Sequence, residues 1–498
     1  MRGCCRRKAC ATFRMKRFLA DTLVLGLAYW VAFLLRFDFQ EPVFGWIPVL
    51  TGMPMMCLVG WGALLLFGCL RVHSGTVTLK SLPRFAGAVA VMVTVQLVMR
   101  WIWNSPEAIW LRPPISVTLM AGTLTLLGWL ALRYMSRLQL RPIEVTDLLG
   151  RSVNEVNTPR VREALQGKTV LITGAGGSIG SELSRQVLAA EPQTLLLVDI
   201  SEAALYVLCE ELIQPGVTQV VPLVGDCGDR GWIRQVLRSH QPDFVLHAAA
   251  YKHVPMLEQN PCAALKNNAL ATRTLAEESA ASAVGTFVLV STDKAVRPVS
   301  VLGITKRLAE IFVHDLATKS QTRFCAVRFG NVLDSSGSAV PKFRRQIQQG
   351  GPVTITDPRM KRYFMTIPEA SGLVLQAATL AKGGELFVLD MGHPVLMTQL
   401  VETMIRRSGL KPGRDIEIVF TGIRPGEKLE ESLDLDAETT ERTAHNRIFV
   451  SRIPRVSATE VEALLVQSIA LAAEEGALDV ARLHTLLTEE GNNKHEVL

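Results

Sequence analysis

The sequence predicts an α/β protein in which four N-terminal membrane-spanning helices precede a doubly wound parallel sheet with a small C-terminal substrate-binding portion. Three features predict it: long uncharged stretches near the start, short Val/Leu/Ile runs that alternate with helix-like stretches later, and a glycine-rich turn after the first run. At 498 residues the chain exceeds the roughly 150 residues of one domain. We expect a membrane domain over 1–134, a linker over 135–168 and a catalytic domain over 169–498, with the substrate-binding part mainly in 331–498.

The charge is unevenly distributed along the chain. The formal net charge is +7, but the first 134 residues contain 14 Lys or Arg and 4 Asp or Glu, a balance of +10, so the remainder carries −3. The basic character therefore belongs to the first part alone, which argues against a nucleic-acid partner. The nine cysteines are odd in number, scattered and without the spacing of a metal site, so we expect reduced thiols and no bound metal.

Four apolar stretches are the expected membrane spans. Residues 46–70 and 113–132 contain no charge over 25 and 20 residues, enough to cross a hydrocarbon core of about 30 Å as helices. Residues 18–35 are interrupted only by Asp21, and residues 85–103 only by Arg100. The alternative, buried helices of a soluble core, is disfavoured because uncharged runs of this length are uncommon there.

The distribution of cations predicts the orientation of these spans. Basic residues gather before the first span and between the second and third, namely Arg2, Arg6, Arg7, Lys8, Arg14, Lys16, Arg17, Arg71, Lys80 and Arg84. The opposite loops hold only Arg36 and Arg112. Both ends of the membrane domain should therefore be cytoplasmic, with the catalytic domain on that side. A cleavable signal peptide is not expected, because the first apolar segment is too long and lacks a small-residue cleavage site.

The second part of the chain has the pattern of a parallel sheet. Apolar runs that we interpret as strands occupy 169–172, 195–198, 220–224, 244–246, 286–290 and 324–327. The first leads into Thr173-Gly174-Ala175-Gly176-Gly177-Ser178-Ile179-Gly180, and a helix begins there. Gly174 allows the tight turn, Gly177 lets a pyrophosphate approach the backbone, and Gly180 lets helix and strand pack closely. The free N–H groups of a helix N-terminus attract phosphate.

Two acidic residues follow the next two strands. Asp199 ends the second strand, 19 residues after Gly180, where a carboxylate can bind the adenosine ribose. Its charge favours NAD over NADP, although NADP is possible. Asp226 ends the third strand, where the adenine edge would lie. The alternative is a glycine-rich turn beside a surface acid. The expected cofactor-binding residues are Gly174, Gly177, Ser178, Ile179, Gly180, Asp199, Asp226, Ala249 and Lys306.

Six segments together resemble a known family. They are Thr173 to Gly180, His247-Ala248-Ala249-Ala250-Tyr251-Lys252-His253-Val254-Pro255, Ser291-Thr292-Asp293-Lys294-Ala295-Val296-Arg297-Pro298, Arg328-Phe329-Gly330-Asn331-Val332, Arg362-Tyr363-Phe364-Met365-Thr366-Ile367-Pro368-Glu369 and Arg424-Pro425-Gly426-Glu427-Lys428. The chain resembles the membrane-bound nucleotide-sugar 4,6-dehydratases of bacterial polysaccharide biosynthesis, in the extended short-chain dehydrogenase/reductase superfamily. The resemblance implies a UDP-N-acetylglucosamine 4,6-dehydratase in the inner membrane, a homodimer or higher homo-oligomer, and other glycan-assembly enzymes as partners.

The sequence departs from this family in two ways. Long members carry a further nucleotide-binding-like domain before the catalytic domain, and the linker after Tyr134 leaves no room for it. The superfamily's Tyr-x-x-x-Lys pair would fall on Leu302 and Lys306, so the usual tyrosine base is missing. Long members similarly carry an apolar residue there, so the missing tyrosine does not by itself imply an inactive enzyme.

Asp293 and Lys294 are the expected acid and base. They follow a strand, at the edge where such sheets place their active sites, and a carboxyl beside a lysine offers two groups whose pKa values a site can separate. For the dehydration that the resemblance implies, we hypothesise that Lys294 takes the carbon 5 proton and Asp293 protonates the leaving 6-hydroxyl. Asp293 is also expected to collect the 4-hydroxyl proton, directly or through water, while Thr292 hydrogen-bonds the 4-oxygen and Lys306 binds the nicotinamide ribose. The alternative for Asp293 and Lys294 is a solvated ion pair.

Substrate contacts are expected mainly from family position. The candidates are Asn331 and Arg424 for the diphosphate and sugar, Arg362 and Thr354 in support, and Lys252 and His253 at the sugar pocket. For each, a structural role is the alternative. Two other functions stay open: a UDP-hexosamine 4-epimerase, disfavoured because epimerisation needs no carbon 5 base, and an inactive NAD-binding scaffold of a glycan-assembly complex.

Overall fold

The protein is represented by a computed structural model, which describes residues 20–37, 47–67, 82–102, 114–138, 159–213, 218–433, 440–451 and 457–473. The chain divides into two compact units. The first consists mainly of Met1–Pro142, and the second contains most of the chain from Ile143 onward. The predicted linker lies largely in residues 139–158, outside the described residues.

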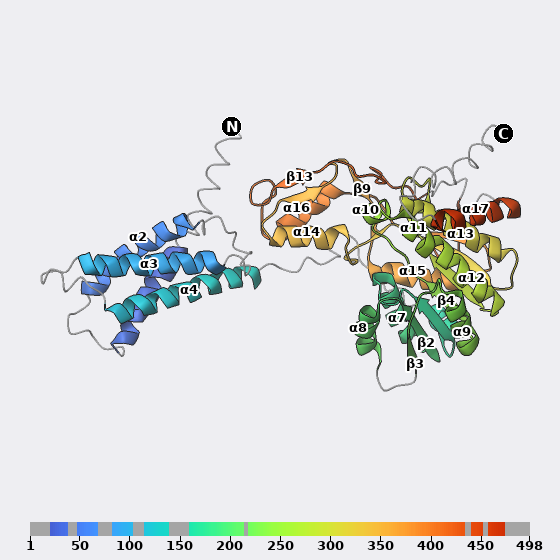
Figure 1. Ribbon diagram of the computed structural model, residues 1–498, viewed down its shortest axis with the longest axis horizontal. Coiled ribbons are helices and arrows are strands. Elements are labelled where there is room, and N and C mark those ends of the chain that lie inside the picture. Colours follow the sequence, from blue (N-terminus) through green and yellow to red (C-terminus); the bar gives the residue numbers. More distant parts are fainter. Residues whose placement is uncertain are drawn as a thin grey trace. The chain divides into compact units, whose positions relative to one another are not determined.

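The described residues of the first unit form four helices. They are a helix over residues 20–36, α2 (Ile47–Leu66), α3 (Leu82–Ile102) and α4 (Ile115–Leu138) (Figure 1). Helix α3 packs against both α2 and α4. Large side chains with almost no exposed surface form their common core, among them Tyr29, Phe33, Met56, Phe85 and Trp129. Helices therefore form at all four predicted stretches.

The membrane-spanning character of these helices is not supported. Over the part of the chain that the structure describes, none of the helices combines the length and the apolar content needed to cross a bilayer. Most of the cations that predict the orientation, including Arg2 to Arg17, Arg71, Lys80 and Arg112, lie outside the described residues. The orientation stays a prediction.

The second unit is built on a nine-stranded sheet. Its strands are β1 (Thr169–Thr173), β2 (Thr194–Asp199), β3 (Gln219–Val224), β4 (Phe244–His247), β5 (Thr286–Val290), β6 (Arg323–Arg328), β11 (Glu385–Leu389), β14 (Thr440–Arg442) and β15 (Ile448–Ser451). The strand order is β14-β15-β11-β6-β5-β4-β1-β2-β3. The strands from β3 to β11 in this order pair in parallel, and β15 and β14 add an antiparallel edge. The order reverses between β1 and β4, where such sheets bind ligands.

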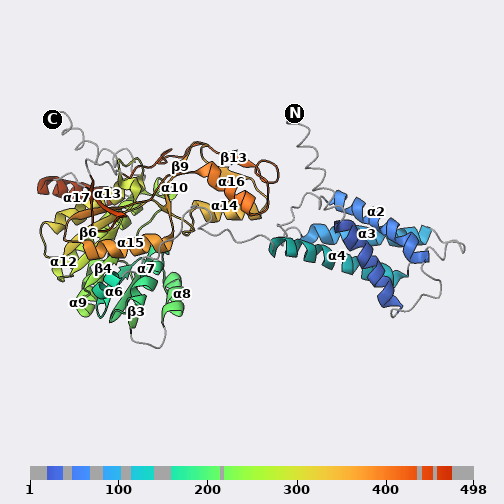
Figure 2. The same cartoon turned by 180° about the vertical axis from the view of Figure 1, so that it is seen from behind.

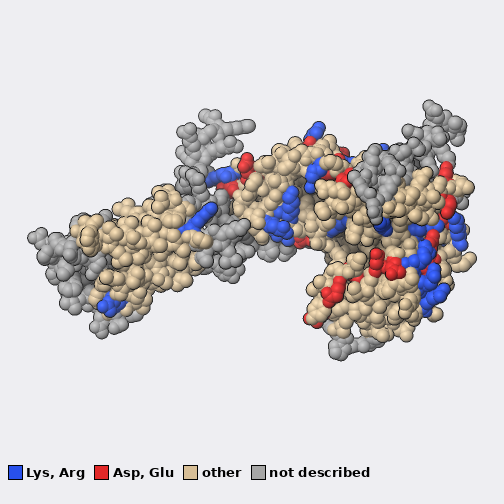
Figure 3. Space-filling view, viewed as in Figure 1, with Lys and Arg blue, Asp and Glu red and all other residues tan. Residues whose placement is uncertain are grey.

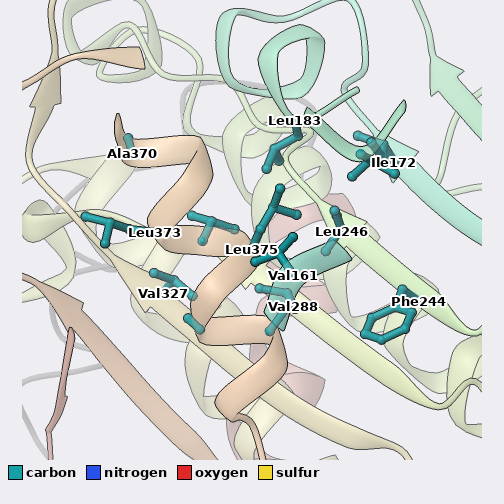
Figure 4. Packing of buried hydrophobic residues seen from close by; sticks show 14 of the residues in the cluster. Val161, Ile172, Leu183, Phe244, Leu246, Val288, Val327, Ala370, Leu373 and Leu375 are labelled. Atoms are coloured by element: carbon teal, nitrogen blue, oxygen red, sulfur yellow. The ribbon is translucent and has the colours of Figure 1, made fainter. Parts of the chain in front are cut away.

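Helices cover both faces of this sheet (Figures 1 and 2). They are α6 (Pro159–Leu165), α7 (Ser178–Ala189), α8 (Glu202–Leu212) and α15 (Ile367–Leu380) on one face, and α9 (Arg230–His240), α12 (Ala271–Ala281) and α13 (Val301–Ala317) on the other. Figure 4 shows Leu183 of α7 near Ile172 of β1, and Leu373 of α15 near Val327 of β6. The predicted doubly wound parallel sheet is confirmed.

The strands could be predicted from the sequence because they are buried on both faces of the sheet. Alternate residues of one strand enter different cores: Val170 and Ile172 pack under α7 and α15, whereas Leu171 packs under α9 and α12. A strand buried on both sides must be apolar at nearly every position, so it appears as a continuous Val/Leu/Ile run. All six predicted runs are strands, with ends within two residues of the prediction.

Shorter elements complete the second unit. Near the site are α10 (Val254–Leu257), α11 (Pro261–Ala264), the π-helix η3 (Leu265–Leu270) and the 3₁₀ helix η4 (Asp293–Ala295). The later part contains β7 (Asn331–Val332), β8 (Val353–Ile355), β9 (Lys361–Arg362), β10 (Phe364–Met365), β12 (Val395–Leu396), β13 (Ile418–Phe420), α14 (Ala339–Gln348), α16 (Met397–Arg407) and α17 (Ala458–Ala473). The pairs β7–β10, β8–β13 and β9–β12 are separate two-stranded sheets.

Candidate active site

The glycine-rich turn joins β1 to α7 and is sterically closed to side chains at two positions. Gly174 has φ +65°, and a Cβ there would lie 2.7 Å from the Cα of Ala249, which follows β4. A Cβ on Gly180 would lie 2.0 Å from the carbonyl oxygen of Gly174. Gly177 differs, because a Cβ there would meet only the Gly174 carbonyl oxygen within 4 Å, at 3.1 Å. A side chain would therefore clash at Gly174 and at Gly180, whereas the space beside Gly177 is open.

The N-terminus of α7 opens onto this space. Gly177 is its N-cap, and no side chain caps the first turn, so the N–H groups of Ser178 and Ile179 begin the helix without a side-chain acceptor. The Ser178 hydroxyl accepts a hydrogen bond from the Ser336 N–H at 3.1 Å. An uncapped helix start above a close-packed glycine turn suits a diphosphate, because the helix dipole and free N–H groups favour negative charge. This geometry fits a dinucleotide.

The two expected ribose and adenine residues are held by backbone groups. Asp199, at the end of β2, accepts hydrogen bonds from the Gly176 N–H at 2.9 Å and the Ser201 N–H at 2.8 Å, one on each carboxylate oxygen. Asp226 accepts one from the Gly228 N–H at 2.8 Å. The carboxylate of Asp199 therefore positions the glycine turn, a role that the sequence did not predict, while its ribose contact stays a prediction.

Thr292, Asp293 and Lys294 form a hydrogen-bonded group after β5. The Thr292 hydroxyl and the Lys294 ammonium both donate to Oδ1 of Asp293, each at 2.9 Å. Lys294 also donates to Oδ1 of Asn331 at 3.3 Å, and its Nζ lies 3.7 Å from Oε1 of Glu431. Because β5 and β1 run parallel in one sheet, this group stands at the same sheet edge as the glycine turn.

Burial distinguishes the members of this group. The side chain of Asp293 has no exposed surface, and Lys294 is 17% exposed. Burial lowers the pKa of Lys294, but the carboxylates of Asp293 and Glu431 outweigh that effect and raise the pKa above the ordinary lysine value. In this arrangement Lys294 is an ammonium at neutral pH. A buried pair of this kind is not the solvated ion pair that the sequence left open.

Lys306 is buried in α13 without a tyrosine one turn before it. Burial lowers the pKa of Lys306 to about 8, although the Glu310 carboxylate one turn later opposes the shift. Leu302 is 6% exposed and belongs to an apolar cluster with Ile304 and Leu308. Leu302 is thus a packing residue in this chain.

The structure places the expected substrate residues at different distances from this group. Asn331 joins it directly, since its side chain bonds to Lys294 and donates to the Tyr363 carbonyl at 3.3 Å. Arg362 is 9% exposed, and its guanidinium donates to the carbonyl oxygens of Lys428 and Leu429 at 2.8 and 3.1 Å. We interpret Arg362 as a residue that holds the segment before Glu431, which is the structural alternative.

The remaining candidates are more open. Arg424 is half exposed and bonds to Glu427 three residues later, with Nε to Oε1 at 3.1 Å. Thr354 lies in β8. Lys252 and His253 are exposed at the start of α10, and a Cβ on Gly337 would lie 2.4 Å from the His253 ring. The substrate roles of these four residues stay predictions.

Two polar residues of this region were not predicted. Glu431 is buried beside Lys294. It lies three residues after the Arg424-to-Lys428 motif, so that motif indicated the neighbouring part of the sequence but not Glu431 itself. Asn268 lies in η3, where its side chain bonds to both the N–H and the carbonyl of Tyr251, at 2.8 and 3.0 Å. π-helical turns often occur at functional positions, but no local sequence pattern predicts where one forms.

Comparison with known proteins agrees with this geometry. The family model described as "Polysaccharide biosynthesis protein" matches residues 170–453. The capsular polysaccharide biosynthesis protein CapD of Staphylococcus aureus is 46% identical over 69% of this chain, which spans 57% of that protein's length. A UDP-N-acetylglucosamine 4,6-dehydratase (inverting) of Campylobacter jejuni is 32% identical over 53% of this chain and 77% of that protein.

A solved structure supports the fold. The X-ray structure of Pen from Bacillus thuringiensis aligns with a TM-score of 0.54 and 30% identity, covering 61% of this chain and 99% of that one. Together with the sheet order and the glycine turn, this alignment confirms an extended short-chain dehydrogenase/reductase fold for the second unit. The chain is thus similar to a nucleotide-sugar dehydratase, and it belongs to the polysaccharide biosynthesis protein family.

Proposed function

We propose that the chain is a UDP-N-acetylglucosamine 4,6-dehydratase that makes a UDP-4-keto-6-deoxy-N-acetylhexosamine for surface polysaccharide or glycan biosynthesis. The observation that carries the proposal is the buried group of Thr292, Asp293, Lys294 and Asn331 at the sheet edge that holds the glycine turn. Loss of water across carbons 5 and 6 requires an acid and a base side by side. The Asp293–Lys294 pair supplies both.

The cofactor proposed is NAD, with NADP possible. Bound NAD would accept the hydride of carbon 4 and return it to carbon 6. The residues that would hold it are Gly174, Gly177 and the N–H groups of Ser178 and Ile179 for the diphosphate, Asp199 for the adenosine ribose, and Lys306 for the nicotinamide ribose. The negative charge of Asp199 would repel the 2′-phosphate of NADP, which supports NAD.

Thr292 and Asp293 have complementary roles in this proposal. Because Asp293 has no exposed surface whereas Thr292 is half-buried, the Thr292 hydroxyl is the outward group of the pair. We infer that the 4-hydroxyl proton passes through Thr292 to Asp293, along the 2.9 Å hydrogen bond between them. Asp293 then carries the proton that the departing 6-hydroxyl needs. This path replaces the tyrosine base that Leu302 cannot supply.

The experiment is incubation of the full chain with UDP-N-acetylglucosamine, followed by mass spectrometry of the sugar nucleotide. A loss of 18 Da, the mass of water, supports the dehydratase. An isobaric product would indicate the 4-epimerase, and an unchanged substrate would favour the non-catalytic scaffold. Asp293→Asn and Lys294→Met should each abolish water loss while dinucleotide binding persists, and full activity in either variant would refute that residue's role.

Membrane attachment is a second proposal for the first unit. Its helices expose large apolar side chains, including Leu58, Leu66 and Trp101, each at least 74% exposed. The face seen in Figure 3 carries few charged residues on this unit. An apolar surface of this extent is costly in water and suits a lipid bilayer. The full chain should sediment with bacterial inner membranes and resist a carbonate wash; recovery in the wash would contradict attachment.

A further inference from the structure

Glu431 is a buried carboxylate beside the candidate base. Its side chain is 4% exposed, and Oε1 lies 3.7 Å from Nζ of Lys294, longer than a hydrogen bond. Oε2 is buried and has no hydrogen-bond partner among the residues that the structure describes. A buried carboxylate oxygen without a partner is costly, so such a position calls for a functional explanation.

The segment that carries Glu431 is fixed from two sides. Lys428 donates to the carbonyl oxygens of Val296 and Arg297, both at 2.8 Å, immediately after η4. On the other side, the Arg362 guanidinium donates to the carbonyls of Lys428 and Leu429. These bonds hold the Glu431 carboxylate against Lys294 rather than leaving it in solvent.

The proton count of the proposed reaction explains what this carboxylate does. Asp293 takes the 4-hydroxyl proton first and is then a neutral acid, so it cannot also relieve Lys294 of a proton. Lys294 must nevertheless be a neutral amine before it can accept the carbon 5 proton. Among the described residues, Glu431 is the other carboxylate within 4 Å of Lys294 Nζ. It is the available acceptor.

We propose that Glu431 is a positioning residue that holds the proton of Lys294 and thereby makes Lys294 the carbon 5 base, an inference that rests on the proposed dehydratase function. In the elimination, the carbon 5–hydrogen bond breaks and its proton goes to Lys294. The electron pair forms the carbon 5–carbon 6 double bond, the carbon 6–oxygen bond breaks, and the proton on Asp293 leaves with the hydroxyl as water.

The proton inventory closes over the whole cycle. When carbon 6 has received the hydride, Lys294 gives its new proton back to carbon 5 and is again a neutral amine. Asp293 is again ionised, and Glu431 then returns the proton it took, so that Lys294 is again the ammonium of the resting site. Two protons are taken, from the 4-hydroxyl and carbon 5, and two are returned, to water and carbon 5. The charged groups around Glu431 are Asp293, Lys294, Lys428 and Arg362.

The test compares Glu431→Gln with Glu431→Asp and with Glu430→Gln as a matched control. Glu430 is the adjacent carboxylate, 58% exposed and paired with Lys361, so its loss should leave water loss unchanged. Each full-length variant is assayed for kcat and KM across pH, with ordinary and carbon 5-deuterated UDP-N-acetylglucosamine. Dinucleotide binding serves as the check on folding.

We expect Glu431→Gln to lower kcat at neutral pH by about 100-fold or more with little change in KM. Its deficit relative to the native protein should shrink as the pH rises, because Lys294 must then release its proton to solvent, and its deuterium isotope effect should increase. Glu431→Asp should recover part of the activity with the native pH profile.

The inference is overturned if Glu431→Gln keeps the native kcat, or if its loss is equal at every pH with no change in isotope effect, as a structural role would give. Failure of the native protein to release water overturns the proposed function, and this inference with it. The two failures are therefore distinguishable.

Discussion

Replacing Glu310 with Gln should destabilise the second unit more than any surface substitution, because Glu310 neutralises a buried arginine. Its side chain has no exposed surface and forms a two-pronged pair with Arg328, at 2.7 Å from Nε and 2.6 Å from Nη2. Ser291 donates to it at 2.7 Å and Arg307 at 3.2 Å. An amide would remove the charge and turn one acceptor into a donor facing Arg328.

The magnitude follows from burial. Removing one partner of a buried ion pair costs about 3–5 kcal/mol, because the other charge stays buried and unpaired. For a unit of this size, that corresponds to a melting temperature lower by the order of 10 °C. The matched control is Glu211→Gln, which breaks an ion pair of Glu211, a half-exposed side chain, with Arg185, where about 0–1 kcal/mol is expected.

The pH dependence gives a second check. Burial alone would raise the pKa of Glu310, but Arg328, Arg307 and Ser291 together lower it below the ordinary value. A lowered folded-state pKa adds stability above the unfolded pKa, about 4.3, and this stability is lost as the pH falls through the folded value. The difference between native protein and Glu310→Gln should therefore be complete at pH 7 and shrink below about pH 4. Thermal unfolding in detergent measures it, and a loss under 1 kcal/mol at pH 7 would refute the reasoning.

Two further predictions concern the cofactor side of the site. Gly180→Ala should abolish dinucleotide binding, because the new Cβ would lie 2.0 Å from the Gly174 carbonyl oxygen, whereas Gly231→Ala in α9, whose Cβ would lie 3.5 Å from Oδ1 of Asp229, should leave binding intact; titration with NAD measures both. Water loss should decline above about pH 8 as Lys306 loses the charge that favours deprotonation nearby, since burial places its pKa there. Lys306→Met should be slow at every pH and lack this decline, and an unchanged alkaline limb in its kcat/KM profile would assign the limb to another group.

The fold could be predicted best where strands are buried on both faces of the sheet. Strands such as β1 and β5 lie in the middle of the sheet with helices on both faces, so nearly every residue is apolar and the run is unmistakable. The edge strand β14 was not predicted, because it is three residues long and contains Thr440, Glu441 and Arg442. A short polar edge strand has no hydrophobic pattern to read.

The candidate site was predictable in its parts but not in its assembly. Asp293 and Lys294 follow a strand, so their place at the sheet edge could be inferred. The contacts of Lys294 with Asn331 and Glu431 join residues 37 and 137 positions apart through loops whose course no local pattern specifies. The same limitation hid the bonds of the Arg362 guanidinium to the carbonyl oxygens of Lys428 and Leu429, while its substrate role stays a prediction.

The electrostatics of the rest of the site are consistent with the absence of a tyrosine at position 302. A tyrosine base works only if a nearby cation lowers its pKa, and in this chain the buried cation Lys306 has a lowered pKa of its own, about 8. In the proposed function, the proton path is instead provided by the Thr292 hydroxyl on the Asp293 carboxylate, in a group that already contains one ammonium and a second carboxylate. A carboxylate can both accept the 4-hydroxyl proton and deliver it to the leaving hydroxyl, whereas a phenol with an ordinary pKa near 10 is a poorer acceptor at neutral pH. In that proposal, moving the proton chemistry from position 302 to Asp293 leaves Leu302 free to pack in the apolar cluster with Ile304 and Leu308, one turn before the buried Lys306.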